Sequence, residues 1–376
     1  TFPYTTLFRS DFVNPEKNPK IAPDSNCFAI KGQKALSINR WGPYSGTPLP
    51  SPLDPEFLRL TKEYYGLVAK RVVFGKVFPK GPIVLMQFLN EGLYSEGRMP
   101  YSYAGDYTRN NIRNYQKFLK HTYGSIKNYN QIHKTNYQKF MEILPPTIYE
   151  GRKPLSDIRQ LHAVIDWNNY GIVYYATWVN ELRQAMQTQG SKDENLPPLI
   201  ANWNPEGDFG QGLDVWATRV DVEKIERLCG VAYGYTNWIG CVNYRQSAYM
   251  RYACLCGRAN GINMEENWGF GKPLYDWQYS YGLTPLYQTL LAIASGCTGY
   301  NVYTAVGTDQ WDKNIDSHHS KPYPSDSPID ENGKLTNKYY LMAGLNKFFG
   351  EYYGKEFFEC EQDSLFSIGF YQPYIQ

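Results

Sequence analysis

The chain has no excess of charge and no long apolar run. Its 38 basic and 36 acidic side chains leave a formal net charge of +2 and form no long blocks of one sign. Nucleic acids and anionic membrane surfaces attract clustered basic residues, so we expect neither as a partner. No uninterrupted apolar stretch reaches the roughly 18 residues of a membrane-spanning helix. With 42% apolar residues over 376 positions, we expect one large globular domain.

The residue patterns of several enzyme classes are also missing. The seven cysteines have neither a paired framework nor zinc-knuckle spacing, and we interpret them as mostly buried thiols. The five histidines lack metal-binding helical spacing, and His318–His319 lies in a polar stretch. There is no Gly-x-Ser-x-Gly elbow and no glycine-rich phosphate loop after a strand. We therefore expect no metal and no organic cofactor.

The two ends of the chain differ from its middle. Residues 2–10 (FPYTTLFRS) look like a translated sequencing adaptor, so we exclude residues 1–10 from the fold. We expect an irregular lead-in at 11–36, a main domain at 37–350, and the start of a truncated further region at 351–376. With the natural N-terminus expected to be missing, the sequence leaves open a secreted, periplasmic or cytoplasmic location. It does not indicate an oligomeric state.

Apolar strand patterns alternate with helical patterns along the main domain. Asp54, Pro55 and Glu56 form a helix-start signal, and helical spacing continues to about Phe74. Further helices are expected at 156–189, 221–228, 247–259, 284–295 and 337–350. Strands are expected at 35–40, 81–89, 198–203, 230–238, 260–266 and 299–306. This alternation predicts an α/β fold, a (β/α)8 TIM barrel that is N-terminally truncated, so that its first strands are missing.

Carboxylates follow two of these predicted strands. Asn90 and Glu91 come directly after the run 81–89, and Glu265 and Glu266 close the run 260–266. In a barrel, strand ends meet at one face, where the reactive groups lie. Two carboxyl groups across a cleft can cleave a glycosidic bond, although Asn90–Glu91 could also simply cap its strand. Neighbouring strand residues point to opposite faces, so only one of the paired glutamates should enter the site.

Four motifs, in this order, resemble glycoside hydrolase family 35: RWGPY (40–44), GPIVLMQFLNEG (81–92), GYNVYTAVGT (299–308) and SDSPIDENG (325–333). Residues 114–146 are more similar to family 42. Both are families of retaining β-galactosidases on (β/α)8 barrels. The resemblance implies an acid/base role for Glu91 and substrate contacts for Asn90 and Tyr44. This sequence departs from the family 35 pattern at residues 45–48 and at Ser325. Ser325 stands where the family has a sugar-contacting tyrosine.

The family's nucleophile can be assigned to either of two positions in this sequence. Aligning Gly269 with the family's glycine selects Glu265, whereas aligning Glu-Asn-Trp selects Glu266; we retain Glu265 as the prediction.

Aromatic residues make up 16% of the chain, and flat rings with polar edges suit sugar faces, although core packing explains most such residues. The candidates for a sugar-binding wall are Trp268, Tyr235, Trp238 and Tyr303.

We therefore expect a retaining β-galactosidase that releases terminal β-D-galactose from a carbohydrate substrate by double displacement. One alternative is a retaining β-glycosidase of β-glucan or xylan type on the same barrel. Another is a catalytically inactive, carbohydrate-binding barrel.

Overall fold

The computed structural model describes residues 37–39, 42–44, 52–90, 109–145, 161–190, 194–202, 222–236, 256, 261–269, 281–310, 321–360 and 363. The expected adaptor segment 1–10, the lead-in 11–36 and the pair His318–His319 lie outside these ranges, as do Glu91 and Trp238. So does the expected helix at 247–259, apart from Cys256. No helix within the described ranges is long and apolar enough to cross a membrane.

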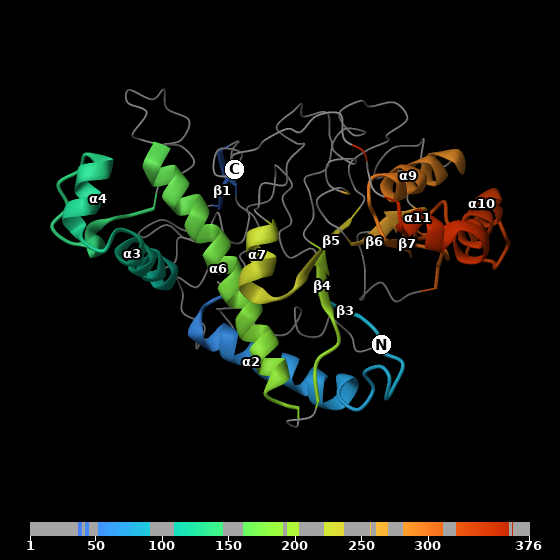
Figure 1. Ribbon diagram of the computed structural model, residues 1–376, viewed down its shortest axis with the longest axis horizontal. Helices are drawn as coiled ribbons and strands as arrows, with labels where there is room; N and C mark the ends of the chain where they lie inside the picture. Colours follow the sequence, from blue (N-terminus) through green and yellow to red (C-terminus); the bar gives the residue numbers. More distant parts are fainter. Residues whose placement is uncertain are drawn as a thin grey trace.

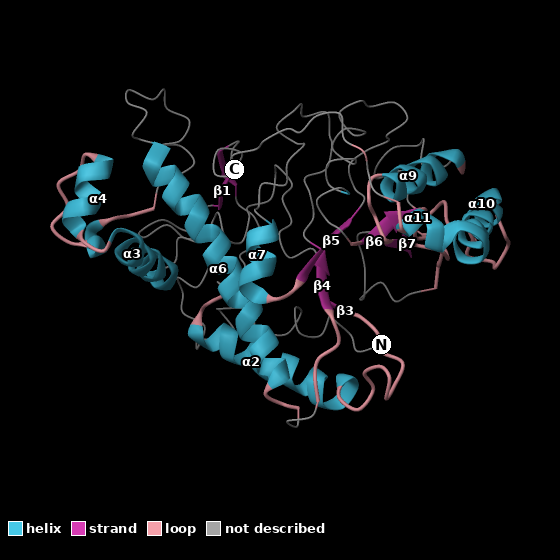
Figure 2. Ribbon diagram, in the orientation of Figure 1, coloured by secondary structure: helices cyan, strands magenta, loops and turns pink. Residues whose placement is uncertain are grey.

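Five parallel strands form the central sheet, in the order β3-β4-β5-β6-β7 (Figures 1 and 2). They are β3 (Met86–Leu89), β4 (Leu199–Asn202), β5 (Ala232–Thr236), β6 (Ile262–Asn267) and β7 (Gly299–Tyr303). Each strand pairs in parallel with its neighbour along the chain. Strands in chain order are typical of a barrel, whereas a doubly wound sheet reverses its strand order. The prediction of a parallel α/β fold is confirmed as a half-barrel sheet.

The strand predicted at 35–40 does not join this sheet. Ser37–Asn39 (β1) pairs antiparallel with Gly42–Tyr44 (β2) in a separate two-stranded sheet. Gly42 and Pro43 belong to β2. Antiparallel pairing needs only a short connection, whereas a parallel neighbour needs a long crossover. Within the described residues, the predicted strand is present at 37–39, but its expected place in the barrel sheet is wrong, and Gly42–Tyr44 of the RWGPY motif pairs with it.

Helices accompany the strands as the periodicity predicted. They are α2 (Pro55–Val68), α3 (Arg109–Tyr123), α4 (Ile126–His133), α6 (Leu161–Gln187), α7 (Val222–Cys229), α9 (Leu283–Ala294), α10 (Asn337–Lys347) and α11 (Gly354–Phe358). Short π-helical or 3₁₀ segments cover 69–73, 140–142 and 348–353. The start of α2 is confirmed, since the Asp54 carboxylate accepts the backbone N–H groups of Glu56 and Phe57 at 3.0 and 3.1 Å.

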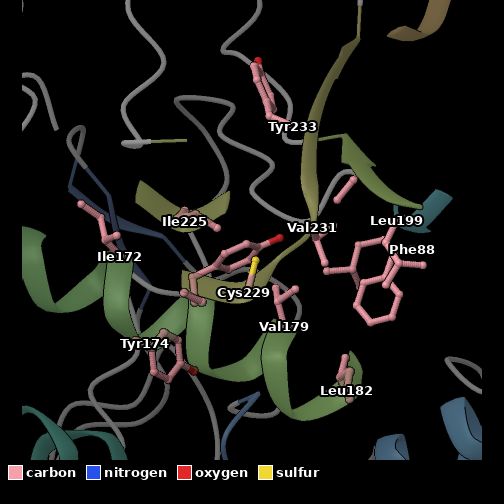
Figure 3. Close-up of a cluster of buried hydrophobic side chains, with 14 of the residues drawn as sticks. Phe88, Ile172, Tyr174, Val179, Leu182, Leu199, Ile225, Cys229, Val231 and Tyr233 are labelled. Atoms are coloured by element: carbon pink, nitrogen blue, oxygen red, sulfur yellow. The ribbon is translucent and has the colours of Figure 1, made fainter. Parts of the chain in front are cut away.

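The main core lies between the sheet and the helices α6 and α7 (Figure 3). Leu199 of β4 packs in one buried cluster with Val179 and Leu182 of α6. Ala201 belongs to the same cluster. Because side chains alternate across a strand, Ile200 and Asn202 lie on the sheet face opposite this helical layer. That second face is the one available for a site.

Three of the described cysteines contribute to the interior. Cys229, Cys256 and Cys297 are buried, Cys360 is exposed, and none of these four is in a disulfide. Burial raises the pKa of each of the three buried thiols above its ordinary value. The interpretation of the cysteines as mostly buried thiols is confirmed for this part of the chain.

Candidate active site

Polar side chains gather at the carboxyl ends of β3, β4 and β6. Asn90 directly follows β3, Asn202 is the last residue of β4, and Glu265 lies in the second half of β6. The strands are parallel members of one sheet, so these positions share one edge of it. Glu91, the predicted acid/base, lies outside the described residues, one position after the exposed Asn90.

A hydrogen-bonded network joins these positions. The Nδ2 of Asn202 donates to the Oε1 of Glu265 and to the Oδ1 of Asn90, each at 3.1 Å. The Nε2 of Gln87 donates to the Oδ1 of Asn90 at 2.8 Å and to the Oδ1 of Asn202 at 3.2 Å. The structure thus brings together Asn90 and Glu265, two residues that the sequence predicted.

The network also contains two residues that the sequence did not identify, Gln87 and Asn202. Asn202 is a polar residue at the end of an apolar strand, which is the signal that drew attention to Asn90. No carboxylate follows Asn202 in the sequence, so the pattern of a polar strand end does not by itself indicate a catalytic position there. Gln87 lies inside its apolar run, where only the direction of its side chain shows that it belongs to the site.

Glu266 has a different environment from Glu265. It is fully buried, and its Oε1 accepts the Oγ1 of Thr289 at 2.9 Å and the Nε2 of Gln288 at 3.4 Å, both from α9. Its Oε2 contacts the Nδ2 of Asn263. Glu266 therefore faces a covering helix, while Glu265 contacts Asn202 at the end of β4, two strands away in the sheet.

An irregularity in β6 accompanies this separation. The register of β6 shifts against β5 between Tyr235 and Thr236, and against β7 between Asn263 and Glu266. Such bulges change the direction of the side chains that follow. The strand thus presents one carboxylate to the candidate site and the next to the helical layer.

Two of the expected wall residues lie in the interior. Tyr235 is fully buried, and its hydroxyl accepts from the Sγ of Cys256 at 3.0 Å. Trp268 is 1% exposed, and its indole N–H donates to the Oγ1 of Thr289 at 3.2 Å. These placements fit the core-packing alternative, because a sugar would reach either ring only if neighbouring side chains moved. Their sugar contacts stay predictions.

Two further expected sugar contacts, Tyr303 and Tyr44, occupy different places. Tyr303 is half-buried at the end of β7, and its carbonyl accepts the backbone N–H groups of Trp268 and Gly269 at 3.0 and 3.3 Å. It therefore lies beside the end of β6, next to the candidate site. Tyr44 is the last residue of β2, outside the five-stranded sheet, and its side chain lies outside the described part of the chain.

A buried lysine connects α10 to the end of β6. The Nζ of Lys338 donates to the carbonyl oxygens of Trp268 and Asp326, each at 2.8 Å. The backbone N–H of Asp326 donates to the carbonyl of Gly269 at 3.0 Å. The SDSPIDENG motif is thereby attached next to the strand that carries Glu265. Burial lowers the pKa of Lys338 to about 8, although the nearby Asp326 carboxylate acts in the opposite direction.

Replacing Lys338 with methionine is expected to remove a pH-dependent part of the stability. Between pH 8 and 10.5 the unfolded chain still holds a proton on this lysine that the folded chain has released. The free energy of unfolding therefore rises with pH across this window, by on the order of 3 kcal/mol from this group. Urea denaturation on both sides of the window, in wild type and Lys338→Met, measures the difference.

Lys334→Met is the matched control for this prediction. Lys334 is exposed four residues earlier, so its removal should leave the dependence on pH as it is in the wild type. Equal dependence on pH in the wild type and in Lys338→Met would contradict the prediction.

Among the residues that the structure describes, no group of three or more His, Cys, Asp or Glu side chains is arranged to hold a metal ion. The network instead consists of one carboxylate and three amides, a set that can hydrogen bond to hydroxyl groups and carry nucleophilic chemistry.

Comparison with known proteins gives one sequence relative. No family model matches the chain. A β-1,2-glucosyltransferase from Ignavibacterium album is 26% identical over 172 residues, which are 45% of this chain and 23% of that protein. The match therefore spans about a quarter of the curated relative.

Solved structures show a wider likeness. A β-galactosidase from the psychrophilic Marinomonas ef1 has a TM-score of 0.59 and 11% identity, over 92% of this chain and 49% of its own. A β-galactosidase from Bacillus circulans sp. alkalophilus has a TM-score of 0.57 and 17% identity, over 90% and 45%. A catalytic mutant of a GH42 β-galactosidase from G. stearothermophilus has a TM-score of 0.56 and 12% identity, over 91% and 44%. The chain thus has an α/β fold similar to glycoside hydrolase barrels and spans under half the length of each of these proteins.

Proposed function

We propose that the chain is the catalytic part of a retaining β-galactosidase built on a (β/α)8 barrel. Glu265 is the nucleophile and Glu91 the acid/base, and terminal β-D-galactosides are the substrates. The observation that carries this proposal is the bonding of Glu265, through Asn202, to Asn90 at the end of β3. The likeness of the fold to β-galactosidases supports the same activity.

The proposed reaction has two steps. In the first, the Glu91 carboxyl protonates the departing glycosidic oxygen while the Glu265 carboxylate attacks the anomeric carbon, forming a glycosyl-enzyme. In the second, Glu91 removes a proton from water, which displaces Glu265 and releases the sugar with its original anomeric configuration. The two carboxyl groups must then lie about 5–5.5 Å apart. The amide group of Asn90 is proposed to hydrogen bond to a hydroxyl of the bound sugar.

A second candidate function is glycosyl transfer from a β-glucoside. The observation that favours it is the 26% identity to a β-1,2-glucosyltransferase. The same glycosyl-enzyme would form, but a sugar hydroxyl would take the place of water in the second step. This candidate shares a glucose-containing substrate with the β-glucan alternative of the sequence analysis, although that alternative is a hydrolase.

Hydrolysis of nitrophenyl β-galactoside and β-glucoside by the full chain, with and without an oligosaccharide acceptor, tests both functions. Our proposal expects turnover of the galactoside, with one free galactose for each nitrophenol. Turnover of the glucoside alone, with less free glucose than nitrophenol when acceptor is present, selects the transferase. Sugar binding without any turnover would reject both in favour of an inactive binding barrel.

A further inference from the structure

Asn202 occupies the centre of the network, although it is neither an acid nor a base. It is fully buried at the end of β4, on the sheet face opposite the helical core. Its side chain contacts groups from two other strand ends, Glu265 of β6 and Asn90 after β3. Glu265 is the proposed nucleophile, and Asn90 directly precedes the proposed acid/base in the sequence.

The orientation of its amide group is set by its neighbours. The Oδ1 of Asn202 accepts from the Nε2 of Gln87, so its Nδ2 must face Glu265 and Asn90. An amide nitrogen carries two hydrogens and can only donate. One hydrogen therefore goes to a carboxylate oxygen of Glu265 and the other to the amide oxygen of Asn90.

This donor acts on a carboxylate that is poorly solvated. Glu265 is only 7% exposed, and burial disfavours the charged form of a carboxyl group unless donors compensate for the lost water. A hydrogen bond to an ionised acceptor is about twice as strong as one between neutral groups. The Nδ2 of Asn202 donates this bond to the Oε1 of Glu265.

We propose that Asn202 is a positioning residue that keeps Glu265 ionised and orients it relative to Asn90. The inference rests on the proposed function, because it assigns Glu265 the role of nucleophile. Asn202 acts through Glu265 and Asn90, and it exchanges no proton and forms no bond with the sugar.

Two substitutions at this position separate orientation from charge. Asn202→Leu has a similar size and removes the donor, so kcat should fall by about 10-fold to 100-fold with little change in KM. Asn202→Asp has the same shape but places a second carboxylate beside Glu265. Two neighbouring carboxylates repel each other when both are ionised, so the pair keeps one proton up to a higher pH than Glu265 alone would. The acidic limb of kcat/KM should then move to higher pH.

Ile200→Val is the matched control, because Ile200 lies on the same face of the same strand and makes no polar contact. It should show the wild-type pH profile, which separates an effect on Glu265 from a general weakening of β4. Circular dichroism verifies that each variant is folded.

A second measurement does not depend on turnover. In protein labelled with ¹³C at the glutamate carboxyl carbons, Glu265 is assigned by its loss in Glu265→Gln, and its titration is followed in wild type and Asn202→Asp. We expect the variant to titrate at higher pH. An unchanged titration and an unchanged rate profile in folded Asn202→Asp would overturn the role of Asn202 alone. If the titration shifts but the wild-type protein turns over no glycoside, the proposed glycosidase function is rejected. The contact between Asn202 and Glu265 would then have no role in catalysis.

Discussion

Glu265→Gln should lower kcat/KM by about 10³-fold or more, whereas Glu266→Gln should change it by less than about 10-fold. The two residues are neighbours in the sequence, and the difference follows from their surroundings. Glu265 contacts Asn202 at the strand ends, while Glu266 is buried against Thr289 and Gln288 of α9. An amide at position 266 should reduce stability instead, by about 1–3 kcal/mol, because it replaces a buried acceptor of several hydrogen bonds.

Azide adds a stereochemical measurement to the rates. In Glu91→Gln the glycosyl-enzyme still forms and azide attacks it, so the product should be the β-glycosyl azide. In Glu265→Ala azide occupies the place of the lost carboxylate and attacks the substrate directly, which gives the α-glycosyl azide. Loss of activity in Glu266→Gln with normal activity in Glu265→Gln would reverse the assignment of the nucleophile.

Asp166→Ala is expected to lower the free energy of unfolding by about 3–5 kcal/mol. Asp166 of α6 is 6% exposed, and both its carboxylate oxygens accept the hydroxyl of Tyr123 from α3, at 2.8 and 2.9 Å. His133 of α4 places its Nε2 3.1 Å from the Oδ2, and its ring stacks on Tyr129 at 3.9 Å. Burial, followed by the nearby Asp166 carboxylate, raises the pKa of Tyr123. Removing the carboxylate therefore removes the shared acceptor that ties these three helices together.

Urea denaturation of the full chain measures this loss. Asp166→Asn, which keeps an acceptor oxygen, should recover part of it. Arg59→Ala is the surface control, because the Arg59 ion pairs with Glu56 and Glu63 are exposed and should contribute little. A loss in Asp166→Ala no larger than in Arg59→Ala would show that the cluster does not hold α3 and α4 to α6.

Local patterns were enough to predict most of the elements of this chain. The period of apolar residues predicted the five sheet strands and the long helix α6, because burial of one face imposes the same spacing wherever the element packs. The start of α2 followed from the capping of free N–H groups by Asp54, which depends on adjacent residues alone. Polar residues at strand ends indicated Asn90 and the pair Glu265–Glu266, because parallel strands bring those ends to one edge.

The directions of side chains could not be predicted in the same way. The register of β6 shifts against both of its neighbouring strands near the two glutamates, and no local pattern shows which of the two faces β4. Asn202 meets Glu265 across 63 positions of sequence, so no local pattern contains that contact. The burial of Trp268 likewise depends on α9, and the position of β2 depends on its hairpin with β1. Spacing along the chain thus specified where helices and strands form, whereas packing between distant segments selected which side chains make up the site.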